Sequence, residues 1–173
     1  MDVMMTGIWG AVLALFAATA TADDVTVDLA QMAHGDGTMH TEHMVDQVTD
    51  PMATAASGMF RFDPSLVRLE PGEAIVFLNS TGEHTVHSIP ALWGADMPEV
   101  AISNAPRVEV PFQTPGVYGL RCRRHRQYGM VMLVVVGDGG GVTDIEPALS
   151  NLRARPAEKA AFRGIWKDYQ AGL

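Results

Sequence analysis

The residues of this chain best suited to chemistry lie together in the stretch RCRRHRQYGM, residues 121–130. It contains the only cysteine, Cys122, with His125 three residues later and Met130 five residues after that. A structural zinc site commonly uses several thiolates, and only one is available here. A cysteine nucleophile would need more than a nearby base, and the sequence indicates no oxyanion hole. One thiolate, two imidazoles and a weak thioether are the ligands of a blue-copper site, so copper fits this set best.

The second imidazole must come from elsewhere in the chain. The stretch GEHTVHSIP, residues 82–90, offers His84 and His87. It follows the run AIVFLN, residues 74–79, which predicts a strand. Both histidines are therefore expected on a loop at the end of that strand, from which either could meet the cysteine loop across a sandwich.

Short apolar–polar alternations, separated by Pro and Gly, make up much of the remaining sequence. Such runs are typical of the antiparallel strands of a sandwich or barrel. Strands are expected within residues 25–30, 59–79 (two or three strands), 107–112, 117–122 and 130–137. Residues 131–136 are apolar at every position, which predicts a central strand.

The composition changes after the last expected strand. GDGGGVTD, residues 137–144, predicts a flexible connector. Asp144 can cap a helix over residues 145–153, and Pro156 can begin a second helix over PAEKAAFRGIWKDYQA. The second helix has apolar residues toward one side, and its charges are expected to form an ordinary solvated face.

The pattern of His84, then Cys122-x-x-His125-x-x-x-x-Met130, resembles the cupredoxins, and within them the pseudoazurins. FDPSLVRLEPGEAIVFLN is similar to that family's strands before the first histidine, and two helices follow the last strand. The resemblance covers about residues 57–173. It implies an all-β fold, an eight-stranded Greek-key cupredoxin sandwich with two C-terminal α-helices.

The resemblance also implies one type 1 copper per chain and a periplasmic electron carrier that is not an enzyme. The metal ligands carried over are His84, Cys122, His125 and Met130. His87 takes the place of a non-ligand in the family, so it is expected to be a surface histidine or a hydrogen-bond partner near the site. Met132, inside the last strand, is expected in the core.

Arg124 departs from the family pattern, which has proline just before the second histidine of the loop. Proline lacks an N–H, so Arg124 restores a donor close to the Cys122 sulfur. Hydrogen bonds to the sulfur tune the redox potential. We expect such a bond here, and a higher potential than in a typical pseudoazurin.

Charge is unevenly distributed along the chain. Residues 23–59 carry seven acids and no Lys or Arg, whereas residues 60–173 carry twelve of each sign. No extended basic face is indicated, which argues against a nucleic-acid binder. The local exception is residues 121–130, called the ligand loop below, whose arginines are Arg121, Arg123, Arg124 and Arg126. Some could be solvated or packed along the sheet edge. The resemblance implies that Arg123, Arg124 and Arg126 form a basic face that docks acidic redox partners such as a copper nitrite reductase.

The N-terminal region is read as a secretory signal over residues 1–22. Residues 7–22, GIWGAVLALFAATATA, are apolar and end in Ala-Thr-Ala, as a cleavage site does. No Lys or Arg precedes them, and a membrane anchor is the alternative, although sixteen residues fall short of the ~20 that span a bilayer. The expected organisation is then a cupredoxin domain over 23–137, followed by a linker and helical extension over 138–173, with no membrane attachment after cleavage.

The segment 31–56 is rich in Met, His and acids and has no strong period. It is expected to be a long loop inserted after the first strand. It could be a disordered acidic tether, or it could bind additional copper, which would make copper handling an alternative function. An oxidase or reductase is disfavoured because the sequence shows no second set of copper ligands.

Overall fold

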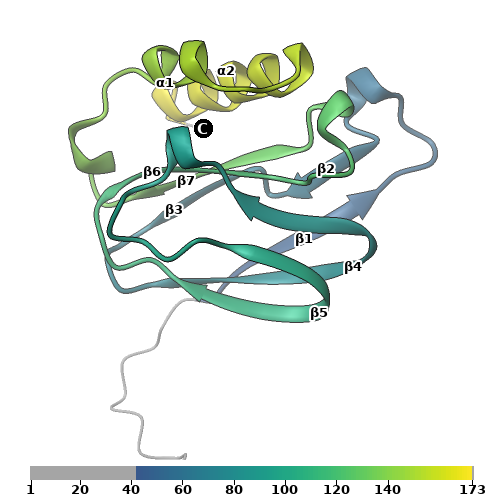
Figure 1. Ribbon diagram of the computed structural model, residues 1–173, viewed down its shortest axis with the longest axis horizontal. Coiled ribbons are helices and arrows are strands. Elements are labelled where there is room, and N and C mark those ends of the chain that lie inside the picture. Colours follow the sequence, from purple (N-terminus) through teal and green to yellow (C-terminus); the bar gives the residue numbers. More distant parts are fainter. Residues whose placement is uncertain (1–41, 173) are drawn as a thin grey trace, which may run out of the picture. The chain divides into compact units, whose positions relative to one another are not determined.

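The computed structural model describes residues 42–172, which form seven strands and two α-helices (Figure 1). The strands are β1 (His43–Thr49), β2 (Phe60–Asp63), β3 (Leu66–Leu69), β4 (Ala74–Ser88), β5 (Ala101–Pro111), β6 (Gly116–Arg121) and β7 (Val131–Val136). The helices are α1 (Glu146–Asn151) and α2 (Pro156–Gln170). The predicted fold class is confirmed, but the described residues hold seven strands where eight were expected. The strand predicted at 25–30 and the predicted signal at 1–22 lie outside the described residues.

The strands form one curved sheet in the order β2-β1-β4-β6-β7-β3, with β5 paired to β4. β1 runs parallel to β4 and β3 runs parallel to β7, whereas the other pairs are antiparallel. β7 lies between two neighbours and all six of its residues are buried. The prediction of a central strand at 131–136 is confirmed.

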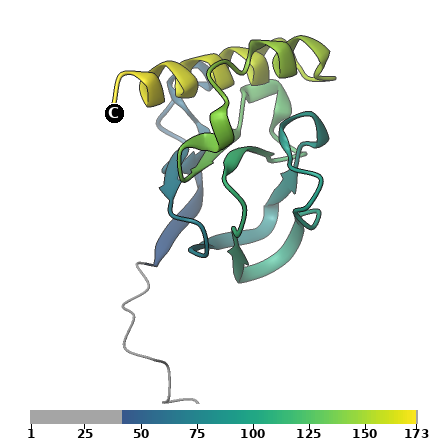
Figure 2. The same ribbon diagram turned by 90° about the vertical axis from the view of Figure 1, so that its left-hand side faces the viewer.

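Two apolar clusters lie on opposite faces of β7. Alternate residues of a strand point to opposite faces, so Met132 and Val134 enter one cluster while Val131 and Leu133 enter the other. The first cluster fills the space between the two halves of the sheet and includes Cys122 and Met130. The second joins the sheet to the C-terminal helices, which cover one of its faces (Figures 1 and 2). Met132 is fully buried, as expected.

The helices begin near the predicted positions. The Asp144 Oδ1 accepts a hydrogen bond from the Glu146 N–H at 2.9 Å, and Pro156 is the first residue of α2. Between β7 and α1 the chain is not a featureless connector, because Gly139–Gly141 form a 3₁₀ turn and Gly139 is buried. The prediction that the charges of α2 form only a solvated face is wrong, since Glu158 is fully buried.

The prediction of an uninterrupted loop over 31–56 is wrong for residues 43–49, which form β1. Val45 and Gln47 point inward, and Gln47 donates to the Leu78 carbonyl at 3.0 Å. Gln47 also bonds to the Ser80 hydroxyl. A polar residue at an inward position hides the strand in the sequence, because apolar alternation is the main strand signal. Residues 31–41 lie outside the described part of the chain.

Within residues 42–172, neither α1 nor α2 has the length and apolar character needed to cross a membrane.

Candidate metal centre

The sequence predicted His84 on a loop beyond the strand, but His84 lies within β4. β4 continues from Ala74 to Ser88, with a shift in its pairing to β5 between Ser80 and Thr85. Gly82, within this irregular stretch, has a φ of 60°. The strand then resumes and pairs with β6, with His87 opposite Arg121. This pairing brings His84 beside Cys122, which follows Arg121.

The ligand loop is closed at its base by hydrogen bonds between the residues that flank β6 and β7. The Cys122 N–H donates to the Met130 carbonyl at 3.0 Å. Between them, the Tyr128 N–H donates to the His125 carbonyl at 3.0 Å, and Arg126–Tyr128 form a 3₁₀ turn. Gly129 ends the turn with a φ of 76°, a conformation that glycine adopts without strain. The loop therefore holds Cys122, His125 and Met130 close together.

Three of the four predicted ligands converge in a buried cluster. The ligand atoms of His84, Cys122 and His125 all lie within 4.8 Å of one another, and all three residues are buried. The Cys122 Sγ is 3.6 Å from the His125 Nδ1. Met130, 1% exposed, adjoins Cys122 through the hydrogen bond at the base of the loop.

The donor set fits a copper ion. The His84 Nε2 is 2.9 Å from the Thr49 hydroxyl, whereas its buried Nδ1 has no hydrogen-bond partner among the described residues. A buried polar atom without a partner costs free energy, and a bound metal would supply the missing partner for Nδ1. One sulfur and two imidazole nitrogens are the trigonal ligands of a type 1 site.

Burial favours the neutral form of the two clustered imidazoles. It is the largest cause that lowers the pKa of His84, and it also lowers the pKa of His125, which His84 lowers further. A neutral imidazole has a lone pair available for a metal. Burial therefore favours the protonation state that metal binding requires.

The sequence analysis did not predict that Glu83 and Thr49 lie beside the rings of His84 and His125. The Glu83 carboxylate accepts a hydrogen bond from the Thr49 hydroxyl at 2.5 Å. Its oxygens lie 3.9 Å from the His84 Nε2 and 3.7 Å from the His125 Nε2. The hydrogen bond from Thr49 is the largest cause that lowers the pKa of Glu83. Glu83 immediately precedes His84, and a carboxylate beside a metal-binding histidine is a common orienting group.

Phe60 is the second missed neighbour. Its ring stacks on the His125 ring with a centroid separation of 3.8 Å and an interplanar angle of 7°. The Tyr128 ring lies beside both of these rings. Its centroid is 4.8 Å from the Phe60 centroid and 6.2 Å from the His125 centroid. No local pattern relates Phe60 to His125, because they are far apart in sequence.

The Cys122 sulfur has polar neighbours other than the one predicted. The Thr85 hydroxyl donates to Sγ at 3.8 Å, and Sγ lies 3.9 Å from the Glu83 carbonyl. The predicted bond from the Arg124 N–H is not among the sulfur's contacts within residues 42–172. The Arg124 side chain instead donates to the Gly82 carbonyl at 2.6 Å. The expectation of a raised potential therefore gains no support from these contacts.

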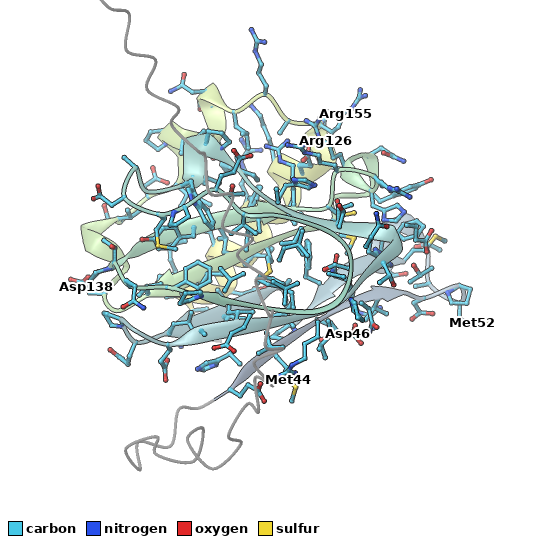
Figure 3. The ribbon with its side chains drawn as sticks, turned by 60° about the horizontal axis from the view of Figure 1, so that its bottom comes forward. Met44, Asp46, Met52, Arg126, Asp138 and Arg155 are labelled. Carbon is cyan, nitrogen blue, oxygen red and sulfur yellow. The ribbon has the colours of Figure 1, made fainter. Side chains whose placement is uncertain are left out.

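The arginines of the loop divide into two pairs. Arg121 and Arg126 both bind the buried Glu158 of α2, at 3.2 Å each. Arg123 and Arg124 are exposed. Figure 3 shows Arg126 near Arg155, whose N–H also donates to Glu158, at 2.7 Å. Arg126 is thus committed to an internal ion pair, which the sequence did not suggest.

The described part of the Met- and His-rich segment does not gather around a site. Met44 lies on β1 and is 53% exposed, whereas Met52 lies beyond the end of β1 and is 92% exposed. Figure 3 shows them at separate places on the surface. His43 is 3.2 Å from the Glu73 carboxylate. The remaining methionines and histidines of the segment 31–56 lie outside residues 42–172.

The fold and this cluster together define a cupredoxin. A family model described as copper binding proteins, plastocyanin/azurin family, matches residues 49–137. The chain belongs to this family, and copper is the metal for which the cluster is suited.

Several relatives and solved structures are pseudoazurins. The chain is 42% identical over 96 residues to the pseudoazurin of Methylorubrum extorquens, covering 54% of this chain and 64% of that protein. It thus spans somewhat less than two thirds of that relative. It is 33% identical over 114 residues to the pseudoazurin of Paracoccus pantotrophus, covering 64% of this chain and 71% of that protein. The crystal structure of pseudoazurin from Methylobacterium extorquens AM1 matches with a TM-score of 0.61 and 30% identity, covering 75% of this chain and 99% of that one.

Proposed function

We propose that this protein is a periplasmic type 1 copper electron carrier of the pseudoazurin kind, and that it is not an enzyme. The observation that carries the proposal is the convergence of His84, Cys122 and His125 in a buried site, next to Met130. When bound, copper supplies a one-electron couple between Cu(II) and Cu(I). The membership of the chain in a copper-binding family supports the choice of metal.

The residues around the site suit a centre that changes little between oxidation states. A mixed set of soft sulfur and borderline nitrogen ligands accommodates both states of copper. Hydrogen bonds at the base of the loop and the Phe60 stack fix the positions of Cys122 and His125. If His84, Cys122, His125 and Met130 all bind the ion, no coordination position would remain open for a substrate. This is the basis for proposing a carrier and not a catalyst.

The ligand assignment is tested by adding Cu(II) to the purified protein and recording visible and EPR spectra. We expect an intense thiolate-to-copper charge-transfer band and one copper per chain. Cys122→Ala should remove the band, because that sulfur is the electron donor of the transition. A wild-type protein that stays colourless, or a band that persists in the variant, would refute the assignment. Two or more coppers per chain, with the excess lost on deleting residues 31–41, would favour copper handling as an additional function.

We further propose that an acidic redox protein, such as a copper nitrite reductase, docks at the exposed arginines beside His125. Arg123 and Arg124 carry this role, whereas Arg126 contributes less because it is paired with Glu158. Glu83 lies beside His125 and opposes an acidic partner at that point. The interface is expected to be small and transient, under ~1,200 Å².

Salt dependence tests the docking surface. The Debye length is ~8 Å at physiological ionic strength, so added salt should slow electron transfer that is steered by charge. We expect the rate between the copper-loaded protein and a copper nitrite reductase to fall as NaCl rises, and Arg124→Ala to weaken this dependence. Lys167→Ala, an equal charge change on α2, is the matched control. A rate that is flat or rises with salt would argue against steering.

The proposed location follows from the N-terminal sequence, which lies outside the described residues. Cleavage after Ala22 would give a mature chain that begins at Asp23. Mass spectrometry of the protein recovered from the periplasm of an expressing bacterium measures this directly. A full-length chain retained in the membrane would favour the anchor.

A further inference from the structure

A hollow lies behind the ligand loop, on the side of the sheet that faces the C-terminal helices. It has a volume of about 570 Å³ and is formed by the end of β4, the end of β6, the ligand loop and the link between α1 and α2. Its lining residues are His87, Ser88, Pro90, Ala91, Arg121, Arg123, Arg126, Asn151, Leu152 and Arg153. Four of them are arginines and none is acidic.

The four arginines differ in what already binds them. Arg121 and Arg126 are held by the buried Glu158. Arg123 and Arg153 are exposed, and within residues 42–172 neither guanidinium makes a hydrogen bond or ion pair. They come from different walls of the hollow, the ligand loop and the α1–α2 link. Two unused guanidinium groups thus border a space that two fixed ones already make positive.

His87 adds a side chain without a hydrogen-bond partner among the described residues to the wall of the hollow. It lines the hollow and is 9% exposed, so its side chain is about nine-tenths buried. Its Nδ1 has no partner in the described part of the chain, and no described residue hydrogen-bonds to its ring. A buried polar side chain without a partner is rare in a folded protein.

We propose that this hollow binds a small oxyanion with two negative charges, of the phosphate or sulfate class. Arg123 and Arg153 would bind its oxygens directly, while Arg121 and Arg126 add positive charge behind them. The planar fork of arginine matches the oxygens of such anions better than a point charge does. A hollow bordered from two walls favours a small ligand that it can enclose over a flat protein surface.

The anion would also affect the metal centre. Arg121 and Arg123 flank Cys122 in the chain, so a bound dianion places negative charge close to the thiolate. This step rests on the proposed function. Negative charge stabilises the more positive Cu(II) state, so the anion lowers the potential. By linkage, the oxidised protein binds the anion more tightly than the reduced protein does.

Calorimetry on the copper-free protein tests the site without reference to copper. Inorganic phosphate is titrated at fixed ionic strength, with NaCl as the balancing salt. We expect saturable binding of one phosphate per chain, similar binding of sulfate, and binding of acetate at least tenfold weaker. Arg153→Ala should weaken phosphate binding at least tenfold, because it removes one of the two unused guanidinium groups. Arg107→Ala, on β5 and outside the hollow, should leave it unchanged.

Several results would overturn the site. These are an absence of saturable binding, acetate binding as tight as phosphate, or equal weakening by Arg153→Ala and Arg107→Ala. Arg153 is exposed and its side chain has no described partner, so its variant is expected to fold, and circular dichroism checks this. Arg123→Ala provides a second variant from the opposite wall and should weaken binding similarly.

Voltammetry of the copper-loaded protein tests the coupling separately. Phosphate should lower the midpoint potential of the wild-type protein, and Arg153→Ala should need at least tenfold more phosphate for the same shift. An unchanged wild-type potential despite measured binding would overturn the coupling but leave the site intact. A protein that fails to bind copper would refute the proposed function, while calorimetry on the copper-free form would still decide whether the anion binds.

Discussion

Two histidines three residues apart on β4, His84 and His87, have similar local properties and different surroundings. Both are buried, both have an Nδ1 without a partner in the described residues, and burial is the largest cause that lowers the pKa of each. His84 meets Cys122 and His125, whereas His87 lies opposite Arg121 and near Arg123. Burial alone therefore does not distinguish a candidate metal ligand from another buried histidine. The side chains that β6 and the ligand loop place beside each ring make the distinction.

The two sides of the ligand loop also differ in the residues that surround them. Toward the sheet interior, Cys122 and Met130 belong to the apolar cluster between the halves of the sheet. Toward the helices, Arg121 and Arg126 bind the fully buried Glu158. The ligand loop thus has an apolar, sulfur-containing face and a charged face. The apolar cluster of the sheet packs against the first, and Glu158 of α2 binds the second.

The most direct way to break the comparison is to remove each β4 histidine in turn. His84→Ala should abolish the charge-transfer band or reduce it severely, because one of the two proposed imidazole ligands is lost. His87→Ala should keep the band, since its ring is not part of the cluster. Visible spectra of both variants after copper loading measure the difference. The assignment of roles along β4 would be reversed if only the His87 variant lost the band.

The charged face is tested at Glu158. Glu158→Gln removes the fully buried counter-charge of Arg121 and Arg126, and breaking a buried pair typically costs about 3–5 kcal/mol in the free energy of unfolding. Glu146→Gln breaks an exposed pair with Arg163 and should have little effect. Urea denaturation of the two variants gives the comparison. Equal losses of stability would show that the buried pair has no special role.

The contact between the ligand loop and α2 is tested at Gly129. A Cβ there would lie 2.9 Å from the Ala157 carbonyl oxygen, and its φ of +76° is one that other residues adopt with strain. Gly129→Ala should cost more than the ~1–2 kcal/mol expected from the backbone conformation alone. Gly82→Ala, with φ +60° and no atom within 4 Å of the added Cβ, is the matched control for strain. If the two variants lose the same free energy of unfolding, the packing of α2 on the loop is unimportant.

The smallest expected effect concerns pH in the copper-free protein. Burial lowers the folded-state pKa of His84, His87 and His125 below the unfolded value near 6.5. Below that pH the unfolded chain binds more protons than the folded one, so stability is lost as pH falls from about 6.5 toward the lowered values.

His87→Gln should make this loss shallower, by at most ~1.4 kcal/mol per pH unit for one proton. Chemical denaturation at several pH values between 5 and 7.5 measures the slope. An unchanged slope would mean that His87 titrates alike in the folded and unfolded chains.

Much of the site could be predicted because its signals are local. Cys122, His125 and Met130 share one short loop, and the apolar run of β7 and the turn before α2 mark the elements that hold it. The residues alone left both His84 and His87 open as the second imidazole, and the resemblance to the cupredoxin pattern selected His84. The placement of His84 within β4 could not be predicted, because the irregular stretch around Gly82 looks like the end of a strand in the sequence.

The parts that escaped prediction depend on contacts between distant residues. Gln47 occupies an inward position of β1 because the Leu78 carbonyl accepts its amide hydrogen. Glu158 reads as one more charge on an amphipathic helix until the fold sets two arginines against it. The stacking of Phe60 on His125 has no sequence signature, since it joins β2 to the ligand loop.

The contact between Glu158 and the ligand loop has a consequence for metal loading. If the ligand loop forms before α2 docks during folding, the four proposed ligands can gather while Arg121 and Arg126 still lack their carboxylate. An ion captured at that moment would meet a more positive environment than in the finished protein. Metal insertion is therefore expected to be most favourable after the last helix has docked, which orders cofactor loading behind completion of the fold.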